Sequence, residues 1–251
     1  MARSIRRASK TGIYHVMMRG VSTQLIFEEP QDYSQFLTYL AEVKEMSKFK
    51  LYAYCLMGNH MHLLIKEEGE PLSQIFKRLG ARYVYWFNRK YGRSGHLFQD
   101  RFKSEAVETD EYLTTILLYI YQNPVKAGLC RHPMDYEWSS RRQLGGCGIV
   151  DEDELFGLIP IDTIKEREGH RIECETLEPK TVRSKSISDE DALVRIKSLS
   201  GARSLTEFQE LNREKQAQVY AELKKQGVSV RQFARLSGLG KNIVERLARK
   251  V

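Results

Sequence analysis

Cysteine is scarce in this chain of 251 residues, and no two cysteines have the spacing of a metal-binding or redox motif. The four are Cys55, Cys130, Cys147 and Cys174, without a CxxC pair. Scattered cysteines are typical of a reducing compartment and argue against a zinc site built from thiolates. We therefore expect a cytoplasmic protein whose metal site, if it has one, uses other ligands.

Long apolar runs are also missing. No segment approaches the roughly 20 apolar residues of a membrane-spanning helix, so we expect no membrane partner. The basic start, MARSIRRASK, lacks a following apolar core, so we expect no signal peptide. The chain carries a formal charge of +7 and has a pI of about 9.1, which favours an anionic partner.

Residues 51–67, LYAYCLMGNHMHLLIKE, contain two short apolar runs on either side of the turn dipeptide Gly58-Asn59. This pattern predicts a β-hairpin. Side chains alternate between the faces of a strand, so His60 and His62 project from one face. Two neighbouring imidazoles can hold a metal ion. A pair of exposed histidines without a role is the alternative that this motif alone leaves open.

Apolar periodicity and capping residues outline the other elements of the first 145 residues. Strands are predicted at Ile13–Arg19 and 104–108, in addition to the hairpin. Helices are predicted at 32–48 with Asp32 as cap, at 71–91, and from Thr109 or Asp110 to a stop at Pro124. The order β-α-β-β-α-β predicts an α+β, ferredoxin-like antiparallel sheet with helices on one face. The last helix is additional and can cross to the histidine face.

The composition changes near Gly145. Residues 146–186 contain ten acidic and six basic residues without a long apolar period, and we interpret them as a linker with short helices near 152–158 and 163–168. Helical periodicity returns in residues 187–251, which contain thirteen basic and eight acidic residues. We thus predict a catalytic domain at 1–145, a linker at 146–186 and a helical domain at 187–251.

The end of the chain has the pattern of a helix-turn-helix. Ser229 is expected to cap one helix, and Gly238-Leu239-Gly240 to form the turn before a basic helix at 241–250. We predict that this domain binds DNA through Lys241, Asn242 and Arg246. A helical bundle whose charges merely interact with solvent is the alternative.

Tyr119 and Asn123 are four residues apart on the third helix and therefore share a face. A tyrosine oxygen can attack phosphorus if a metal polarises the phosphate. His60, His62 and the Asn123 carbonyl oxygen form a ligand set that suits Mn²⁺ and accepts Mg²⁺. Tyr119 as an ordinary core aromatic is the alternative.

Tyr112 and Tyr121 are rival nucleophiles on the same helix, and Tyr121 faces away from Asn123.

Four segments, YHVMMRG, YCLMGNHMHLLI, GHLFQDRFKS and YIYQNPVKAGL, occur in this order within residues 13–129. They resemble the motifs of single-tyrosine HUH transposases of the IS200 type, above all the group associated with repetitive extragenic palindromes in bacteria. The resemblance implies that His60 and His62 are the metal-binding pair. It implies that Tyr119, in Tyr-x-x-x-Asn-Pro, is the nucleophile and that Asn123 is the third ligand.

The resemblance also implies the activity: cleavage of single-stranded DNA at a hairpin, a 5′-phosphotyrosine intermediate and a free 3′-OH that later attacks it. Arg19, Arg101 and Lys103 fall in the matching segments as phosphate contacts, with surface charge as the alternative. The first strand departs from the family, since Gly20 is followed by Val21-Ser22-Thr23 where an Asn-rich turn is usual. More loosely, the C-terminal helices resemble the DNA-binding domain of replication initiators.

Three functions compete at this point. The first is a metal-dependent single-strand endonuclease and strand transferase, and the presence of all four site residues favours it. The second is a domesticated DNA-binding regulator that no longer cleaves. The third is a replication initiator or relaxase, but relaxases usually have the tyrosine before the histidines. We expect a nucleoid-associated protein of the bacterial cytoplasm, with both a homodimer and a monomer open.

Overall fold

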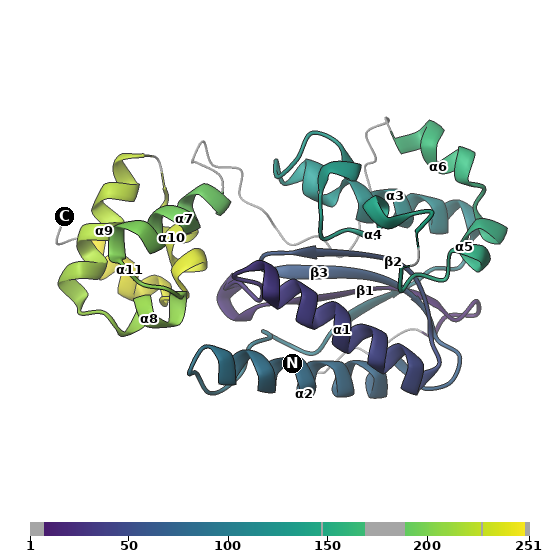
Figure 1. Ribbon diagram of the computed structural model, residues 1–251, viewed down its shortest axis with the longest axis horizontal. Helices are drawn as coiled ribbons and strands as arrows, with labels where there is room; N and C mark the ends of the chain where they lie inside the picture. Colours follow the sequence, from purple (N-terminus) through teal and green to yellow (C-terminus); the bar gives the residue numbers. More distant parts are fainter. Residues whose placement is uncertain (1–7, 147, 169–188, 227, 249–251) are drawn as a thin grey trace.

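The first part of the chain folds around a four-stranded antiparallel sheet with the strand order β2-β3-β1-β4 (Figure 1). The computed structural model describes residues 8–146, 148–168, 189–226 and 228–248. The strands are β1 (Ile13–Arg19), β2 (Lys50–Met57), β3 (His60–Lys66) and β4 (Lys103–Ala106). The predicted hairpin is confirmed, since β2 and β3 pair on either side of Gly58-Asn59. The predicted ferredoxin-like α+β fold is confirmed as well.

Two helices, α1 (Pro30–Ser47) and α2 (Leu72–Lys90), cover one face of the sheet (Figure 1). Alternate strand residues such as Val16 and Leu63 pack against them, together with Leu40 of α1, in one buried apolar cluster. The period of two in the strands and of 3.6 in the helices thus produces the layer that their sequences predict.

Asp32 does not cap α1 as predicted. The helix begins at Pro30, Glu29 is the N-cap, and Asp32 occupies the third helical position. Its carboxylate accepts the amide hydrogens of Glu28 and Glu29 at 2.6 and 3.0 Å. The helix starts earlier because proline is favoured at the first helical position, where no amide donor is needed.

The opposite face of the sheet is covered by α3 (Asp110–Lys126), which contacts β2 and β3. Thr109 caps it as predicted, because its hydroxyl accepts the amide hydrogen of Tyr112 at 3.2 Å. The predicted stop at Pro124 is wrong. The helix continues to Lys126 and ends before Gly128, which has φ 74°. Proline removes one amide donor, but it lies in the final turn, which the buried helix face still supports.

Among the described residues, shorter helices also lie in this layer beside α3 (Figure 1). They are the 3-10 turn η2 (Pro133–Asp135), α4 (Ser140–Gln143), α5 (Glu152–Leu158) and α6 (Ile161–Glu168). Buried side chains of α5 and α6 belong to the same apolar cluster as α3 and the second sheet face. Residues 152–168, which the composition places in a linker, therefore pack on the sheet domain.

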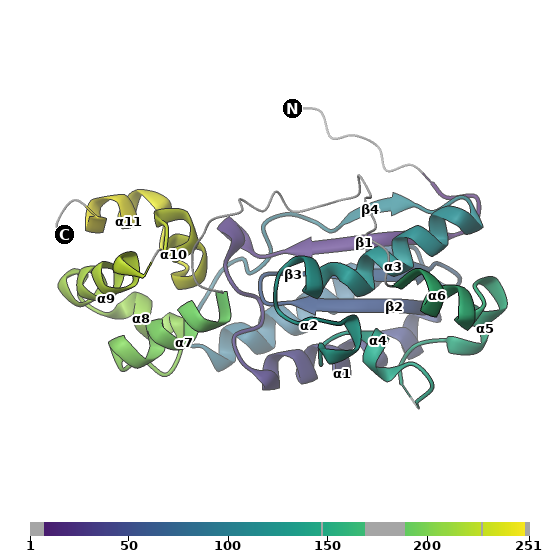
Figure 2. The ribbon, with the colours of Figure 1, turned by 90° about the horizontal axis from the view of Figure 1, so that it is seen from above.

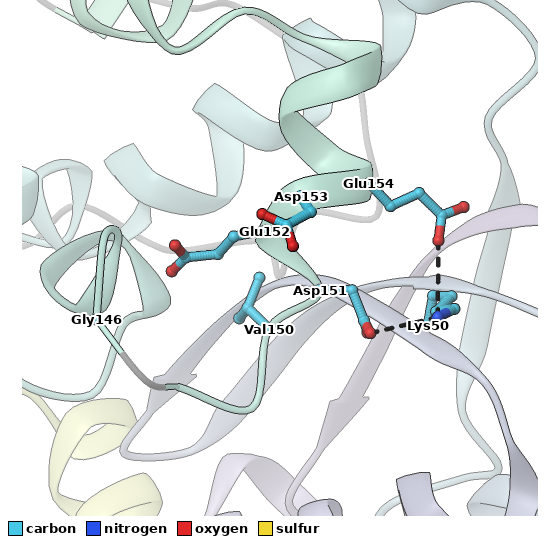
Figure 3. Close-up of a pocket in the computed structure, with 7 residues that line it drawn as sticks. All are labelled: Lys50, Gly146, Val150, Asp151, Glu152, Asp153 and Glu154. Carbon is cyan, nitrogen blue, oxygen red and sulfur yellow. Dashed lines mark ion pairs between the residues drawn. The ribbon is translucent and has the colours of Figure 1, made fainter.

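Ion pairs and hydrogen bonds attach this segment to β2. The carboxylate of Asp151 accepts the amide hydrogen of Leu51 at 2.8 Å. Lys50 forms ion pairs with Asp151 at 3.6 Å and with Glu154 at 3.9 Å, beside a shallow acidic hollow (Figure 3). The domain boundaries themselves stay predictions.

Within residues 189–226 and 228–248, five helices form the C-terminal unit around a third apolar core (Figure 1). They are α7 (Asp189–Ser200), α8 (Leu205–Glu210), α9 (Arg213–Lys225), α10 (Val230–Ser237) and α11 (Lys241–Ala248). Ser229 caps α10 as predicted, accepting the amide hydrogen of Gln232 at 3.1 Å. The last residues of the predicted 241–250 helix lie outside the described residues. Within the described ranges, no helix has the length and apolar character needed to cross a membrane.

The C-terminal helices contact the sheet domain beside the end of β1. There the chain forms the 3-10 turn η1 (Val21–Thr23), against which α10 packs (Figure 2). Leu25 belongs to the apolar core of the C-terminal unit. A carboxylate oxygen of Glu28 accepts the amide hydrogen of Leu205 at 3.1 Å.

Candidate active site

Strand register places His60 and His62 on the sheet face that α3 covers. In the pairing of β1 with β3, Arg19 lies opposite His60 and Met17 lies opposite His62. Directly opposed residues project to the same face. His60 is 6% exposed and His62 is fully buried, so the exposed-histidine alternative does not describe this pair.

Asn123 of α3 lies between the two histidines. Its Oδ1 is 3.4 Å from Nε2 of His60, and its Nδ2 is 3.3 Å from Nε2 of His62. One turn earlier on the helix, the ring of Tyr119 stands edge-on to the ring of His62, with 5.6 Å between centroids. The structure thus brings together the four residues that the sequence singles out for chemistry.

The surroundings of His60 determine which ring nitrogen carries its hydrogen. Nδ1 lies 2.7 Å from Oδ1 of Asn59, an oxygen that can only accept, so the hydrogen is on Nδ1. Nε2 therefore presents a lone pair. That lone pair faces a second acceptor, Oδ1 of Asn123.

His62 adopts the same tautomer for a different reason. Asn123 is oriented with its amide nitrogen, which can only donate, towards His62. In this orientation Nε2 of His62 accepts, and the hydrogen of His62 is on Nδ1. Nδ1 then donates to Nε2 of His15, which lies 2.9 Å away. Both His60 and His62 consequently present an Nε2 lone pair towards Asn123.

Burial keeps these imidazoles neutral. Desolvation lowers the pKa of His15 to about 3 and the pKa of His60 to about 4. It also lowers the pKa of His62 well below its usual value, and the neighbouring histidines lower it further. Neutral imidazole is the form that binds metal ions.

The donor set fits a divalent cation. With the hydrogen of His60 on Nδ1, the lone pairs of its Nε2 and of Oδ1 of Asn123 face each other at 3.4 Å, an arrangement that a positive charge stabilises. No three His, Cys, Asp or Glu side chains are grouped as metal ligands in the part of the chain that the structure describes. A cation here would therefore need the amide oxygen of Asn123, and water, to complete its coordination.

Tyr119 is nearly inaccessible, with 1% of its surface exposed. Its ring contacts His62 and also stands edge-on to His15, at 5.8 Å between centroids. The ammonium of Lys126 lies 4.7 Å from the ring centroid. The phenol is therefore beside the candidate ligands, but a DNA strand can reach its oxygen only after the side chain or its cover moves.

The two rival tyrosines have other surroundings. The hydroxyl of Tyr112 donates to Oε1 of Glu105 at 2.6 Å. Tyr121 is fully buried, and burial raises its pKa. It lies two residues before Asn123 and so projects from a different face of α3. The geometry favours Tyr119 over both.

Arg19 is the predicted phosphate contact that lies next to the histidines. It ends β1 opposite His60, and its Nε is buried without a hydrogen-bond partner among the described residues. Burial lowers the pKa of Arg19, and the positive charge of Arg235 on α10 lowers it further. Arg235 lowers the pKa of His60 as well. The docked C-terminal unit thus brings a second guanidinium to this side of the site.

The other predicted DNA contacts are exposed. Lys103 begins β4 and Arg101 precedes it. Lys241, Asn242 and Arg246 lie on α11 in the C-terminal unit, and Lys241 forms an ion pair with Glu245 at 3.3 Å. All five side chains are reachable, but those on α11 belong to a different structural unit from His60.

Sequence reasoning missed four residues that the structure brings to the site or its edge: His15, Asn59, Glu105 and Arg235. Strand alternation places His15 on the same face as Arg19, four residues later, and this signal was available. No local pattern indicates which strand pairs with β1, or that α10 packs beside it.

Comparison with known proteins points in the same direction. The family model of IS200-like transposases matches residues 8–123. A REP-associated tyrosine transposase of Haemophilus influenzae is 31% identical over 132 residues, spanning 48% of this chain and 74% of the relative. The one of Escherichia coli is 23% identical over 154 residues, spanning 61% and 83%. The solved structure of a REP-associated tyrosine transposase bound to a REP hairpin has a TM-score of 0.55 at 19% identity. The match covers 73% of this chain and 100% of that one, and it shows a shared fold.

Proposed function

Because the chain belongs to the family of REP-associated tyrosine transposases, we propose that it cleaves and rejoins single-stranded DNA at hairpin-forming or palindromic repeats. The observation that carries this proposal is the convergence of His60, His62 and Asn123 beside Tyr119. The structural neighbour was solved with a REP hairpin bound, which supports a hairpin as the substrate.

In the proposed reaction the phenol oxygen of Tyr119 attacks the scissile phosphorus in line with the departing 3′ oxygen. A bond forms between tyrosine and the 5′-phosphate, and the bond from phosphorus to the 3′ oxygen breaks. The phenol releases its proton to solvent, and the departing oxygen takes up one proton to become a free 3′-OH. Attack by a 3′-OH on the phosphotyrosine reverses the step and joins two strands.

His60, His62 and Asn123 would hold Mg²⁺ or Mn²⁺ through their Nε2, Nε2 and Oδ1 atoms, and the bound cation supplies Lewis-acid polarisation of the scissile phosphate. The protein itself orients the metal ligands and the nucleophile. Asn59 fixes the tautomer of His60, as described above. The helix α3 holds Tyr119 and Asn123 one turn apart.

The C-terminal unit is proposed to bind DNA. Its last two helices are joined by a short turn at Gly238, which has φ 68°, and α11 exposes Lys241, Asn242 and Arg246. Its contact with η1 also brings Arg235 close enough to Arg19 for their charges to interact. A guanidinium is suited to a phosphate of the bound strand, and Arg235, which is ion-paired with Asp189 here, would exchange that carboxylate for the phosphate.

A DNA-binding regulator that does not cleave is the second candidate. The 1% exposure of Tyr119 favours it, because the nucleophile is covered in this conformation. The two candidates differ in a single measurable property, the covalent protein–DNA adduct, since both predict hairpin binding.

The proposal is tested with labelled hairpin oligonucleotides, the matching duplex, and Mg²⁺, Mn²⁺ or EDTA. We expect cleavage of the hairpin with metal, little cleavage of the duplex, and none in EDTA. Cleavage that persists in EDTA would contradict the role assigned to His60 and His62. Tight hairpin binding without cleavage under any of these conditions would favour the regulator.

A further inference from the structure

Among the described residues, a buried histidine nitrogen behind His62 has no hydrogen-bond partner. In the tautomer assigned above, Nδ1 of His62 donates to Nε2 of His15 at 2.9 Å, which places the hydrogen of His15 on Nδ1. His15 is fully buried, and its Nδ1 has no partner among the described residues. A buried N–H group without an acceptor is costly and calls for an explanation.

A carboxylate oxygen on the neighbouring strand β4 lacks a hydrogen-bond donor among the described residues. Oε2 of Glu105 is buried and has no donor within the described ranges, whereas Oε1 accepts the hydroxyl hydrogen of Tyr112 at 2.6 Å. In the pairing of β1 with β4, Glu105 lies directly opposite His15. The Cβ atoms of such a pair are about 4.5–5.5 Å apart on one face. A side-chain rotation or one bridging water is therefore enough to connect the two groups.

We propose that Glu105 and His15 form a positioning relay for His62, in which Glu105 accepts the Nδ1 hydrogen of His15 and His15 accepts the Nδ1 hydrogen of His62. The relay rests on the metal site of the proposed function. Its carboxylate makes His15 a better acceptor, and thereby makes Nε2 of His62 a stronger electron donor towards a cation. It also fixes the ring orientation of His62 and supports the tautomer that the amide of Asn123 selects.

Packing alone does not account for these side chains. A buried histidine and a carboxylate with one unsatisfied atom each are less favourable than apolar residues of similar size at the same positions. The neighbouring Tyr112 hydroxyl holds the carboxylate in place from the helix side. A role in orienting a hydrogen-bond acceptor for His62 accounts for His15, Glu105 and Tyr112 together.

The test compares Glu105→Ala, Glu105→Gln and His15→Phe with the control Ser104→Ala, which lies on β4 but points to the other face. Mn²⁺ affinity of the full chain is measured by calorimetry without DNA. We expect Glu105→Ala and His15→Phe to raise the Kd for Mn²⁺ by about 10–100-fold, the usual effect of losing an outer-shell partner. Glu105→Gln keeps an acceptor oxygen without the charge and should fall in between. Ser104→Ala should match the wild type.

A second readout does not depend on metal. Long-range proton–nitrogen NMR of the metal-free wild-type protein should show the hydrogens of His62 and His15 both on Nδ1. Glu105→Ala should shift the Nδ1 signal of His15, whereas Ser104→Ala should leave it in place. Absence of Mn²⁺ binding in the wild type would contradict the proposed metal site, and the tautomer would then still decide the relay. A wild-type His62 with its hydrogen on Nε2 would overturn the relay, as would unchanged Mn²⁺ affinity in Glu105→Ala. Because Glu105 is only half-buried, Glu105→Ala should fold even if His15→Phe does not, and it then still tests the relay.

Discussion

The carboxylate of Glu28 accepts the amide hydrogen of Leu205 at 3.1 Å, and thereby joins two parts of the chain that are 177 positions apart. Leu25, three residues earlier, packs into the apolar core of the C-terminal helices. Because this segment directly follows β1 and η1, the C-terminal unit is held beside Arg19 and the candidate site. The docking of the two units is therefore relevant to how DNA is bound.

The contribution of Glu28 to the stability of the folded protein is predicted to fall as pH rises from about 5 to about 8. Burial raises the pKa of Glu28 to about 7, and Asp32 adds to this, whereas the Leu205 amide, Lys197 and Arg93 oppose it. A carboxyl group with a raised pKa in the folded state keeps a proton that the unfolded chain releases. The stabilisation is thus complete below the ordinary pKa of 4.5 and is lost as pH passes about 7.

Glu28→Gln keeps a neutral side chain at every pH and should flatten this dependence. Thermal unfolding of the wild type and of the variant between pH 5 and pH 8 provides the measurement. The matched control is Glu29→Gln, which alters the neighbouring carboxylate and its ion pair with Lys90 at 2.5 Å but leaves Glu28 in place. An unchanged pH slope in Glu28→Gln would show that another group is responsible.

Tyr119→Phe is expected to abolish the covalent protein–DNA adduct and largely to spare hairpin binding. The phenyl ring keeps the contacts with His62 and His15, so the attacking oxygen is the main loss. Tyr121→Phe and Tyr112→Phe should both retain the adduct, which a denaturing gel with labelled substrate resolves as a shifted band. If the band survives in Tyr119→Phe and disappears in Tyr121→Phe, the nucleophile is assigned to the wrong tyrosine.

His60→Ala and His62→Ala should suppress the adduct through loss of metal affinity rather than loss of the nucleophile. Asn123→Ala should have a smaller effect, because water can replace one oxygen ligand. Mn²⁺ titration of adduct formation separates the two cases, since raised Mn²⁺ should partly restore Asn123→Ala. Equal and unrestorable loss in all three variants would contradict the assignment of Asn123 as an exchangeable oxygen ligand.

Arg235→Ala is expected to weaken hairpin binding and to reduce the slope of log K against log salt concentration by about 1. The reason is the loss of a guanidinium that acts on Arg19 and His60 and that would exchange its partner Asp189 for a strand phosphate on binding. Fluorescence anisotropy at several salt concentrations measures both quantities. Lys224→Ala removes an exposed cation at the end of α9 and serves as the control. A salt slope equal to that of the wild type would remove Arg235 from the DNA contacts.

The spacing of residues along the sequence determined several features of the fold and of the candidate site. The turn at Gly58-Asn59, the shared face of His60 and His62, and the four-residue separation of Tyr119 and Asn123 all follow from periods of two and 3.6 residues. The cap of α10 and the order of elements in the ferredoxin-like fold follow in the same way. Each of these features depends on residues that are close in sequence, which is where propensity and patterning act.

Two helix boundaries differ from those that local sequence patterns predict, because other residues nearby outweigh the predicted cap or stop. Proline at the start of α1 moved the cap from Asp32 to Glu29, and the buried face of α3 carried the helix past Pro124. Asp32 is a common capping residue and Pro124 a common helix breaker, so both signals are present in the sequence. The residues around each of them decide where the helix begins or ends.

Tertiary structure alone decided what surrounds the chemical groups. His15 meets His62 across 47 positions, and Glu105 lies opposite His15 because β4 pairs with β1. The burial of Tyr119 and the contact between Glu28 and Leu205 likewise arise from pairings between distant segments. Such pairings are selected by the burial of whole faces and by hydrogen bonding between strands, and these involve residues that no local window of the sequence contains.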